Sequence, residues 1–146
     1  MKLTEIIESR PENTIFHIGS QSNFFFVGNR EEYEANIDTI SDKYRSYIER
    51  ELETFQTSIR IARGKLLKAR HEYERQAIQE QIMGYMTRYE ALKNAYKITK
   101  QAPSMRDREV LDVCLNTVDG GINIKVEGWE QGRYWKLSEW RAKHEI

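Results

Sequence analysis

The sequence predicts an α+β fold in which a long helical hairpin is inserted into a small antiparallel sheet built from both ends of the chain. Between Asn29 and Gln101 there is no proline, and apolar residues recur every three or four positions, as on one face of an amphipathic helix. Short apolar runs bounded by glycine and polar turn residues flank this region on both sides. With 146 residues, the chain is expected to form one domain. Residues 1–28 would supply a helix and a β-hairpin, residues 29–101 the long helices, and residues 104–146 the remaining strands.

The N-terminal part predicts a short helix followed by the hairpin. Residues 3–9 place Leu3 and two isoleucines on one helical face, and Pro11 ends that helix. The runs TIFHIG (14–19) and FFFVG (24–28) predict two strands joined by a polar turn. Because side chains alternate along a strand, at least one of the three consecutive phenylalanines must face away from the sheet's own core. Such a ring either packs against a partner chain or forms a stacking platform for a planar ligand.

The central region predicts two helices that pack as an antiparallel pair. Asn29 and Glu32 have the spacing of a capping box at the start of the first helix. A single helix over residues 30–100 would measure on the order of 100 Å, so a hairpin is expected, with its turn between Thr54 and Gly64. Its apolar stripe is too long for the remaining residues to cover. A homodimer or higher homo-oligomer is therefore expected.

The C-terminal part predicts further strands. Pro103 ends the helical region, and Val110, Leu111, Val113 and Leu115 follow as a strand. The turn Asp119–Gly121 precedes a half-buried strand over residues 122–126, and RYWKL (133–137) is expected to add a short last one. Cys114 stands between apolar neighbours and is expected to be a buried structural thiol.

The sequence lacks the patterns of an enzyme. Neither glycine-rich phosphate-binding motif is present, and none of the three histidines has a second ligand at metal-binding spacing. His17 is expected to be a packed or hydrogen-bonded strand residue. The chain is therefore interpreted as a non-enzyme with no catalytic residues, metal or cofactor. Twenty-three basic residues balance twenty-three acidic ones, which disfavours DNA, and no apolar run is long enough to predict a membrane span.

A set of polar, aromatic and basic residues near the two ends of the chain is the strongest sign of a ligand site. The turn 19–23 offers hydroxyl and amide groups, and Arg106 and Arg108 flank Asp107 in a geometry suited to a diphosphate. Each feature also has an ordinary interpretation, as turn residues, a surface salt bridge or core aromatics. Their joint occurrence at the two ends of the chain predicts a pocket. The aromatic candidates for stacking are Phe24, Phe26, Tyr85, Tyr89, Trp129 and Trp135.

Several of these segments resemble one family of small phage proteins. They are KLTEIIESRP, HIGSQSNFFFVG followed by NREEYEANID, then MRDREVLD and VEGWEQGRYW. Together they resemble the Thoeris anti-defence proteins of the first type, over about the first and last forty residues. The helical middle matches only in kind.

The resemblance implies a viral sponge located in the cytoplasm of an infected bacterium. Proteins of that family bind a cyclic ADP-ribose isomer, such as glycocyclic ADP-ribose, that a bacterial TIR-domain enzyme makes, and hold it without cleaving it. It also implies long helices wrapped around a second subunit, pockets between subunits and, in some members, a separate site for cyclic oligonucleotides. In this sequence the arginines would neutralise the pyrophosphate, and Asp107 or Glu109 would accept from ribose hydroxyls. The ligand-binding residues assigned in this way are Gly19, Ser20, Gln21, Ser22, Asn23, Phe24, Tyr89, Arg106, Asp107, Arg108 and Glu109.

The alternative interpretation is a phage coiled-coil module that recognises another protein and has no nucleotide ligand. It explains the long helices equally well. It leaves the pairing of the 19–23 turn with the arginines as coincidence.

Overall fold

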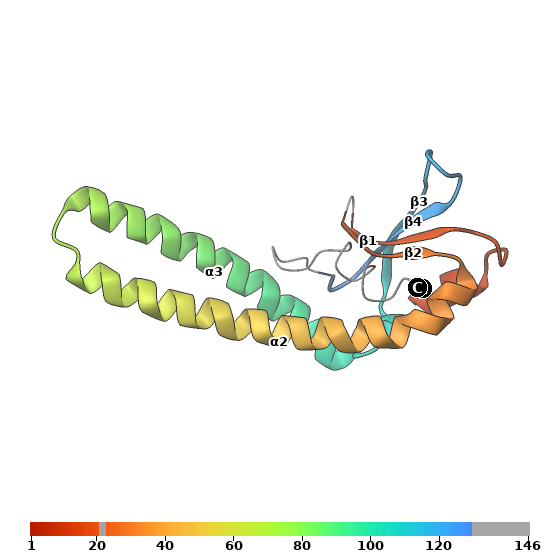
Figure 1. Ribbon diagram of the computed structural model, residues 1–146, viewed down its shortest axis with the longest axis horizontal. Coiled ribbons are helices and arrows are strands. Elements are labelled where there is room, and N and C mark those ends of the chain that lie inside the picture. The colour runs from red at the N-terminus through yellow and green to blue at the C-terminus, as the bar shows by residue number, and fades with distance from the viewer. Residues whose placement is uncertain (21–22, 130–146) are drawn as a thin grey trace.

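The computed structural model describes residues 1–20 and 23–129, which form a sheet at one end and a long helical hairpin that projects from it (Figure 1). The fold is α+β, as predicted. In chain order the elements are α1 (Leu3–Glu8), β1 (Phe16–Ser20), β2 (Asn23–Gly28), α2 (Arg30–Lys68), α3 (Glu72–Gln101), η1 (Met105–Asp107), β3 (Val110–Leu115) and β4 (Ile122–Val126).

The sheet is mixed, and the prediction of a purely antiparallel sheet was wrong. Its strand order is β2-β1-β4-β3, with antiparallel pairs at both edges and a parallel pair, β1 with β4, at the centre. The two antiparallel pairs are local hairpins, whereas parallel strands require a long crossover connection. Here the connection between β1 and β4 contains both long helices, so it has ample length for the parallel arrangement. The further strand expected at 133–137 lies outside the described residues.

The helical hairpin is present, but its turn lies later than predicted. α2 has 39 residues and α3 has 30, and the turn occupies residues 69–71 instead of the interval from Thr54 to Gly64. Gly64 is a helical residue, although an interior glycine costs a helix about 1 kcal/mol relative to alanine. Ile59 and Ala62, just before this glycine, are buried. Packing between the helices thus outweighs the weak local signal.

The start of α2 has the predicted capping box. The backbone N–H of Glu32 donates to Asn29 Oδ1 at 2.9 Å, and the backbone N–H of Asn29 donates to Glu32 Oε1 at 3.2 Å. Two N–H groups that the helix itself leaves unpaired are satisfied in this way. The entry from β2 into α2 is therefore fixed by local chemistry.

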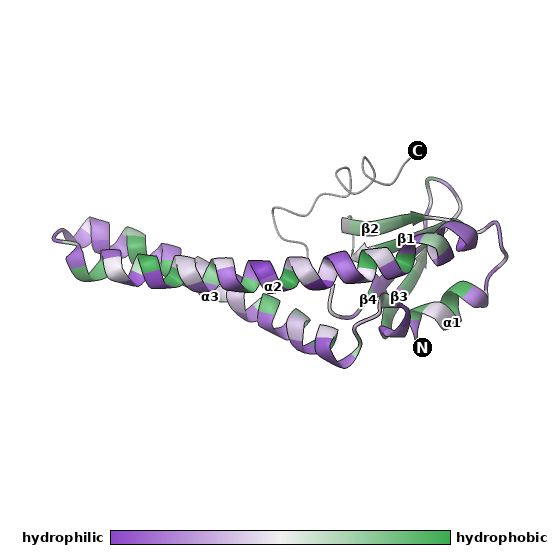
Figure 2. Cartoon of the chain, turned by 60° about the horizontal axis from the view of Figure 1, so that its bottom comes forward, coloured by the Kyte–Doolittle hydropathy of each residue, from purple (hydrophilic) through white to green (hydrophobic). Residues whose placement is uncertain are grey.

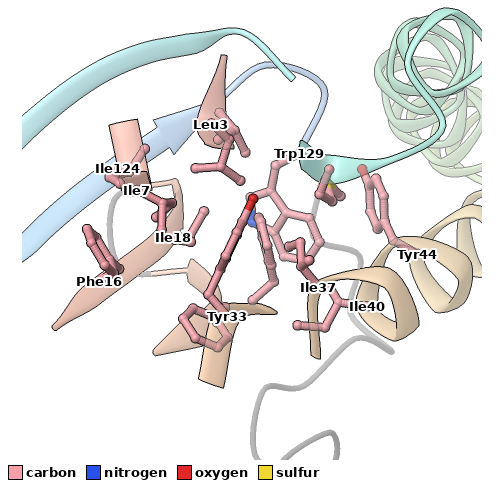
Figure 3. Close-up of a cluster of buried hydrophobic side chains, with 14 of the residues drawn as sticks. Leu3, Ile7, Phe16, Ile18, Tyr33, Ile37, Ile40, Tyr44, Ile124 and Trp129 are labelled. Carbon is pink, nitrogen blue, oxygen red and sulfur yellow. The ribbon is translucent and has the colours of Figure 1, made fainter. Parts of the chain in front are cut away.

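The core lies where α1 and the first half of α2 cover the inner face of the sheet (Figure 3). Tyr44 and Trp129 pack with ring centroids 4.8 Å apart, and Trp129 also contacts Phe25 at 4.9 Å. Trp129 and Phe26 are thus core residues, in agreement with the ordinary interpretation of these two aromatics. The fully buried apolar residues of this core include Leu3, Ile7, Phe16, Ile18, Phe25, Tyr33, Ile37, Ile40, Tyr44 and Ile48.

The outer part of the helical hairpin is much less buried. Polar and apolar residues alternate along its surface (Figure 2), and several large apolar side chains are exposed. They are Ile61, Leu67, Tyr73, Met83 and Met86. No helix in the described ranges has the length and apolarity needed to cross a membrane.

Replacing Gly64 by alanine is expected to raise the free energy of unfolding by about 0.5–1 kcal/mol, because alanine loses less backbone entropy in a helix. A Cβ at this position meets nothing within 4 Å, so no clash opposes the gain. Urea unfolding followed by circular dichroism checks this. A loss of stability in Gly64→Ala would show that an unseen neighbour occupies this surface.

Candidate ligand-binding site

The strand register places eight residues on the face of the sheet opposite to the core, which we call the outer face. Its composition is mixed, whereas the inner face is apolar. One row across β3, β4, β1 and β2 consists of Cys114, Asn123, His17 and Val27, and the next row consists of Asp112, Lys125, Gly19 and Phe24.

A β-bulge in β2 decides which phenylalanines are buried. Ile18 pairs with Phe26 and Gly19 pairs with Phe24, so Phe25 is an extra residue between these pairs. The bulge lets Phe25 and Phe26 both enter the core, at 0% and 1% exposure. Phe24 is half-buried on the outer face, with its ring edge-on to the ring of His17 at 5.4 Å. The prediction that one of the three rings faces away from the core is confirmed.

His17 is held by a carboxylate from the turn between β3 and β4. Its Nε2 lies 2.6 Å from Asp119 Oδ2, and Asp119 Oδ1 accepts from the backbone N–H of Gly121 at 2.8 Å. These two hydrogen bonds, that from Gly121 first, lower the pKa of Asp119 below its usual value. An ionised carboxylate only accepts, so Nε2 of His17 is the donor. The prediction of a hydrogen-bonded strand histidine is confirmed.

The partner of His17 could not be identified from the sequence. Asp119 was recognised only as part of a turn signal, and the two residues meet because β1 and β4 are parallel neighbours. Beside them, Asn116 Nδ2 donates to Asn123 Oδ1 at 2.9 Å. The outer face thus carries a hydrogen-bonded polar network next to an aromatic ring.

The predicted loop 19–23 is described only in part. Gly19 pairs with Phe24 and Ser20 pairs with Asn23, so these residues belong to the strands of the hairpin. Gln21 and Ser22 lie outside the described residues. Phe24 therefore lies directly beside the loop, as its assignment to the same site requires.

Arg106 belongs to η1, and its side chain lies against α2. There the carboxylates of Glu34 and Asp38 compensate its charge. Its Nη1 is 2.7 Å from Glu34 Oε2, and its Nε is 3.0 Å from Asp38 Oδ1. The hydrogen bond to Asp38, and then that to Glu34, raise the pKa of the guanidinium. The guanidinium also lies 5.6 Å from the centre of the Tyr33 ring. The hydroxyl groups of Tyr33 and Thr4 are hydrogen-bonded, with their oxygens 3.0 Å apart. Burial raises the pKa of Tyr33 to about 12.

Arg108 is a core residue, and its assignment to a ligand needs correction. It is only 1% exposed, and burial lowers the pKa of its guanidinium. Its Nε donates to the carbonyl of Ala102 at 2.8 Å, its Nη2 to Thr99 Oγ1 at 2.8 Å, and its Nη1 to the carbonyl of Glu127 at 3.2 Å. The alternation Arg-Asp-Arg therefore directs the two cations to different places, one at the surface and one in the interior.

The two acidic neighbours of these arginines are exposed. Asp107 belongs to η1, and Glu109 lies 3.3 Å from the N-terminal amine of Met1. The N-terminus reaches this position because Lys2 forms a β-bridge with Glu109. Both carboxylates can therefore be reached by a ligand from solvent.

Tyr89 lies away from the sheet, in a groove of about 660 Å³ between α2 and α3. The helices project from the sheet (Figure 1), and every residue that lines the groove belongs to α2 or α3. In the single chain, Tyr89 is thus not combined with Phe24 or Arg106. The other groove residues are Glu53, Gln56, Thr57, Ile59, Arg60, Arg63, Met86 and Glu90.

Two further observations concern possible chemistry. Within residues 1–20 and 23–129, no group of three or more metal-ligating side chains is close enough to hold a metal ion. Cys114 is exposed, so the prediction of a buried thiol was wrong. It lies on the outer face of an edge strand, where apolar neighbours in sequence do not imply burial.

In comparisons with known protein families, curated proteins and solved structures, none matches this chain.

Proposed function

We propose that this protein binds and sequesters a cyclic ADP-ribose isomer made by a bacterial TIR-domain enzyme, and that it holds the ligand without cleaving it. The observation that carries the proposal is the position of Phe24, whose ring lies on the outer face beside the hairpin loop 19–23. A ring held outside the core next to polar loop groups suits the stacking of a planar base. The resemblance of the segments around it supplies the identity of the ligand.

In this proposal the protein is phage-encoded and acts in the cytoplasm of the infected bacterium. By holding the signal it keeps the Thoeris effector inactive. A sponge needs only affinity for its ligand, and the proposal assigns no catalytic role to any residue.

The proposed site combines groups from two copies of the chain. The loop and Phe24 of one chain would face Arg106, Asp107 and Glu109 of another. Arg106 would exchange its present carboxylate partners for the ligand's diphosphate, because the side chains of Glu34 and Asp38 are 45% and 74% exposed and can turn into solvent. Arg108 takes no part in this proposal, since its donors are satisfied inside the fold.

Calorimetric titration with glycocyclic ADP-ribose tests the proposal. We expect saturable binding by the natural protein and a roughly tenfold or larger loss of affinity in Phe24→Ala, since one base stacked on an aromatic ring contributes about 1–3 kcal/mol. Tyr73→Ala removes an exposed ring from α3, away from the sheet, and is the control. Chromatography of the ligand after heat denaturation of the complex should recover it intact. Absence of binding, or conversion of the ligand, would refute the proposed function.

A protein-interaction module remains the second candidate, because apolar side chains are exposed along the helical hairpin. Leu67 is 89% exposed and Met83 is 68% exposed, and a covering chain would remove both side chains from water. This candidate would gain if Leu67→Glu/Met83→Glu abolished the protein's effect in infected cells while nucleotide binding remained. Light scattering on the same variant shows whether the covering chain is a second copy.

A further inference from the structure

The outer face of the sheet carries four chemically different side chains around a glycine. Phe24, Gly19 and Lys125 follow one another in one row across β2, β1 and β4, and His17 and Asn123 lie next to them in the neighbouring row. We propose that this face binds an adenine ribonucleotide diphosphate along the row, with the base on Phe24, the diphosphate between Lys125 and Arg106 of the second copy, and one ribose over His17 and Asn123. The inference rests on the proposed function and extends its site to residues of β1 and β4.

The spacing of the row suits an extended ligand. Neighbouring strands lie about 4.8 Å apart, so the positions of Phe24 and Lys125 are about 10 Å apart across β1. Gly19 places no side chain between them. A ribonucleotide can therefore lie across the strands with its two ends on an aromatic ring and a cation.

The charges on the face favour an anion at one end. Lys125 is exposed and, within the described part of the chain, forms no ion pair. The negative charge of Asp119 is directed to His17 and to the N–H of Gly121. Asp112, the neighbour of Lys125 on β3, is the carboxylate that opposes an anionic ligand. Removal of Asp112 and removal of Lys125 should therefore act in opposite directions on the same ligand.

The polar network orients the groups assigned to the ribose. Because Nε2 of His17 is engaged by Asp119, Nδ1 is the ring nitrogen left for a hydrogen bond with a hydroxyl group. Asn123 uses its Oδ1 to accept from Asn116, which leaves its amide nitrogen as a donor. Hydrogen-bonding groups on adjacent strands match a ribose, whose hydroxyl groups both donate and accept.

Calorimetry with ADP-ribose, adenosine, inorganic pyrophosphate and glycocyclic ADP-ribose tests this assignment. Lys125→Ala should weaken both diphosphate nucleotides by roughly tenfold and change adenosine little, whereas Asp112→Asn should tighten the same two nucleotides. Pyrophosphate alone should bind much more weakly than ADP-ribose, because it has no base to stack. Lys65→Ala, at the far end of α2, is the matched control and should leave all affinities unchanged. Lys125, Asp112 and Lys65 are exposed, so the three variants should fold like the natural protein.

Two results separate this inference from the proposed function. If the natural protein binds the cyclic isomer and neither Lys125→Ala nor Asp112→Asn changes its affinity, the outer face is not the site and the inference fails alone. In the other case the cyclic isomer does not bind, but ADP-ribose does, and its affinity falls in Lys125→Ala and rises in Asp112→Asn. The proposed ligand is then wrong, and the assignment of the outer face as a nucleotide site is supported.

Discussion

Replacing Arg108 by alanine is expected to lower the free energy of unfolding by about 3–5 kcal/mol. The change leaves two carbonyls and one hydroxyl without their donor, and each unsatisfied buried group costs about 1–3 kcal/mol. It also leaves a cavity next to the Tyr44 ring, which lies 6.0 Å from the guanidinium. Relief from burying a charge offsets part of this loss. Urea unfolding monitored by circular dichroism measures the difference.

The location of Arg108 explains why the effect should be large. Thr99 and Ala102 lie at the C-terminal end of α3, where unpaired carbonyls and the helix dipole favour a cation. The third partner, Glu127, follows β4, and the carbonyl of Arg108 accepts from the N–H of Leu3 at the start of α1. One side chain therefore links the end of the hairpin to the sheet, while its backbone holds the first helix.

Arg106 provides the internal control for this prediction. Arg106 lies only two positions before Arg108 in the chain, but its side chain is 25% exposed and its ion pairs involve exposed carboxylates. Exposed ion pairs contribute about 0–1 kcal/mol, so Arg106→Ala should unfold at almost the same urea concentration as the natural protein. Equal destabilisation by the two substitutions would contradict the division into a surface arginine and a core arginine.

Sequence reasoning treated these two arginines alike because local sequence carries no information on which one reaches a helix end. The same limit applies to the sheet. Turn residues and alternation identified β1, β2, β3 and β4, yet they could not reveal that β1 and β4 are parallel neighbours, because that pairing depends on a connection of about a hundred residues. The hydrogen bond between His17 and Asp119 depends on this parallel pairing, so it could not be predicted from the sequence either.

Elements with strong local chemistry were predicted best. The capping box at Asn29 and the stop at Pro11 depend on interactions within a few residues, and both agree with the structure. The hairpin turn at residues 69–71 has no glycine or proline, so its position is decided by packing between the helices. Likewise, Phe24 could be identified as the outward ring only after the bulge at Phe25 was known.

Replacing Gly128 by alanine is expected to cost at least about 3 kcal/mol, from two sources. Gly128 has φ of 76°, a left-handed conformation that costs an L-residue roughly 1–2 kcal/mol. In addition, an added Cβ would overlap Nη1 of Arg108 and lie 2.7 Å from Cγ2 of Ile98. The carbonyl of Gly128 also accepts from the hydroxyl of Tyr44 at 2.7 Å, which opposes a shift of the backbone away from the clash.

Gly120 separates the two sources. It has the same φ of 76°, but a Cβ there would meet nothing within 4 Å. Gly120→Ala should therefore show only the conformational cost, about 1–2 kcal/mol, and the excess in Gly128→Ala measures the clash. In an Arg108→Ala background, where the space of the guanidinium is vacated, Gly128→Ala should cost less than in the natural protein, by roughly 0.5–3 kcal/mol of coupling. Strictly additive effects in this double-mutant cycle would show that Arg108 does not occupy the space next to Gly128, and the linkage of α3 to the sheet through this arginine would have to be abandoned.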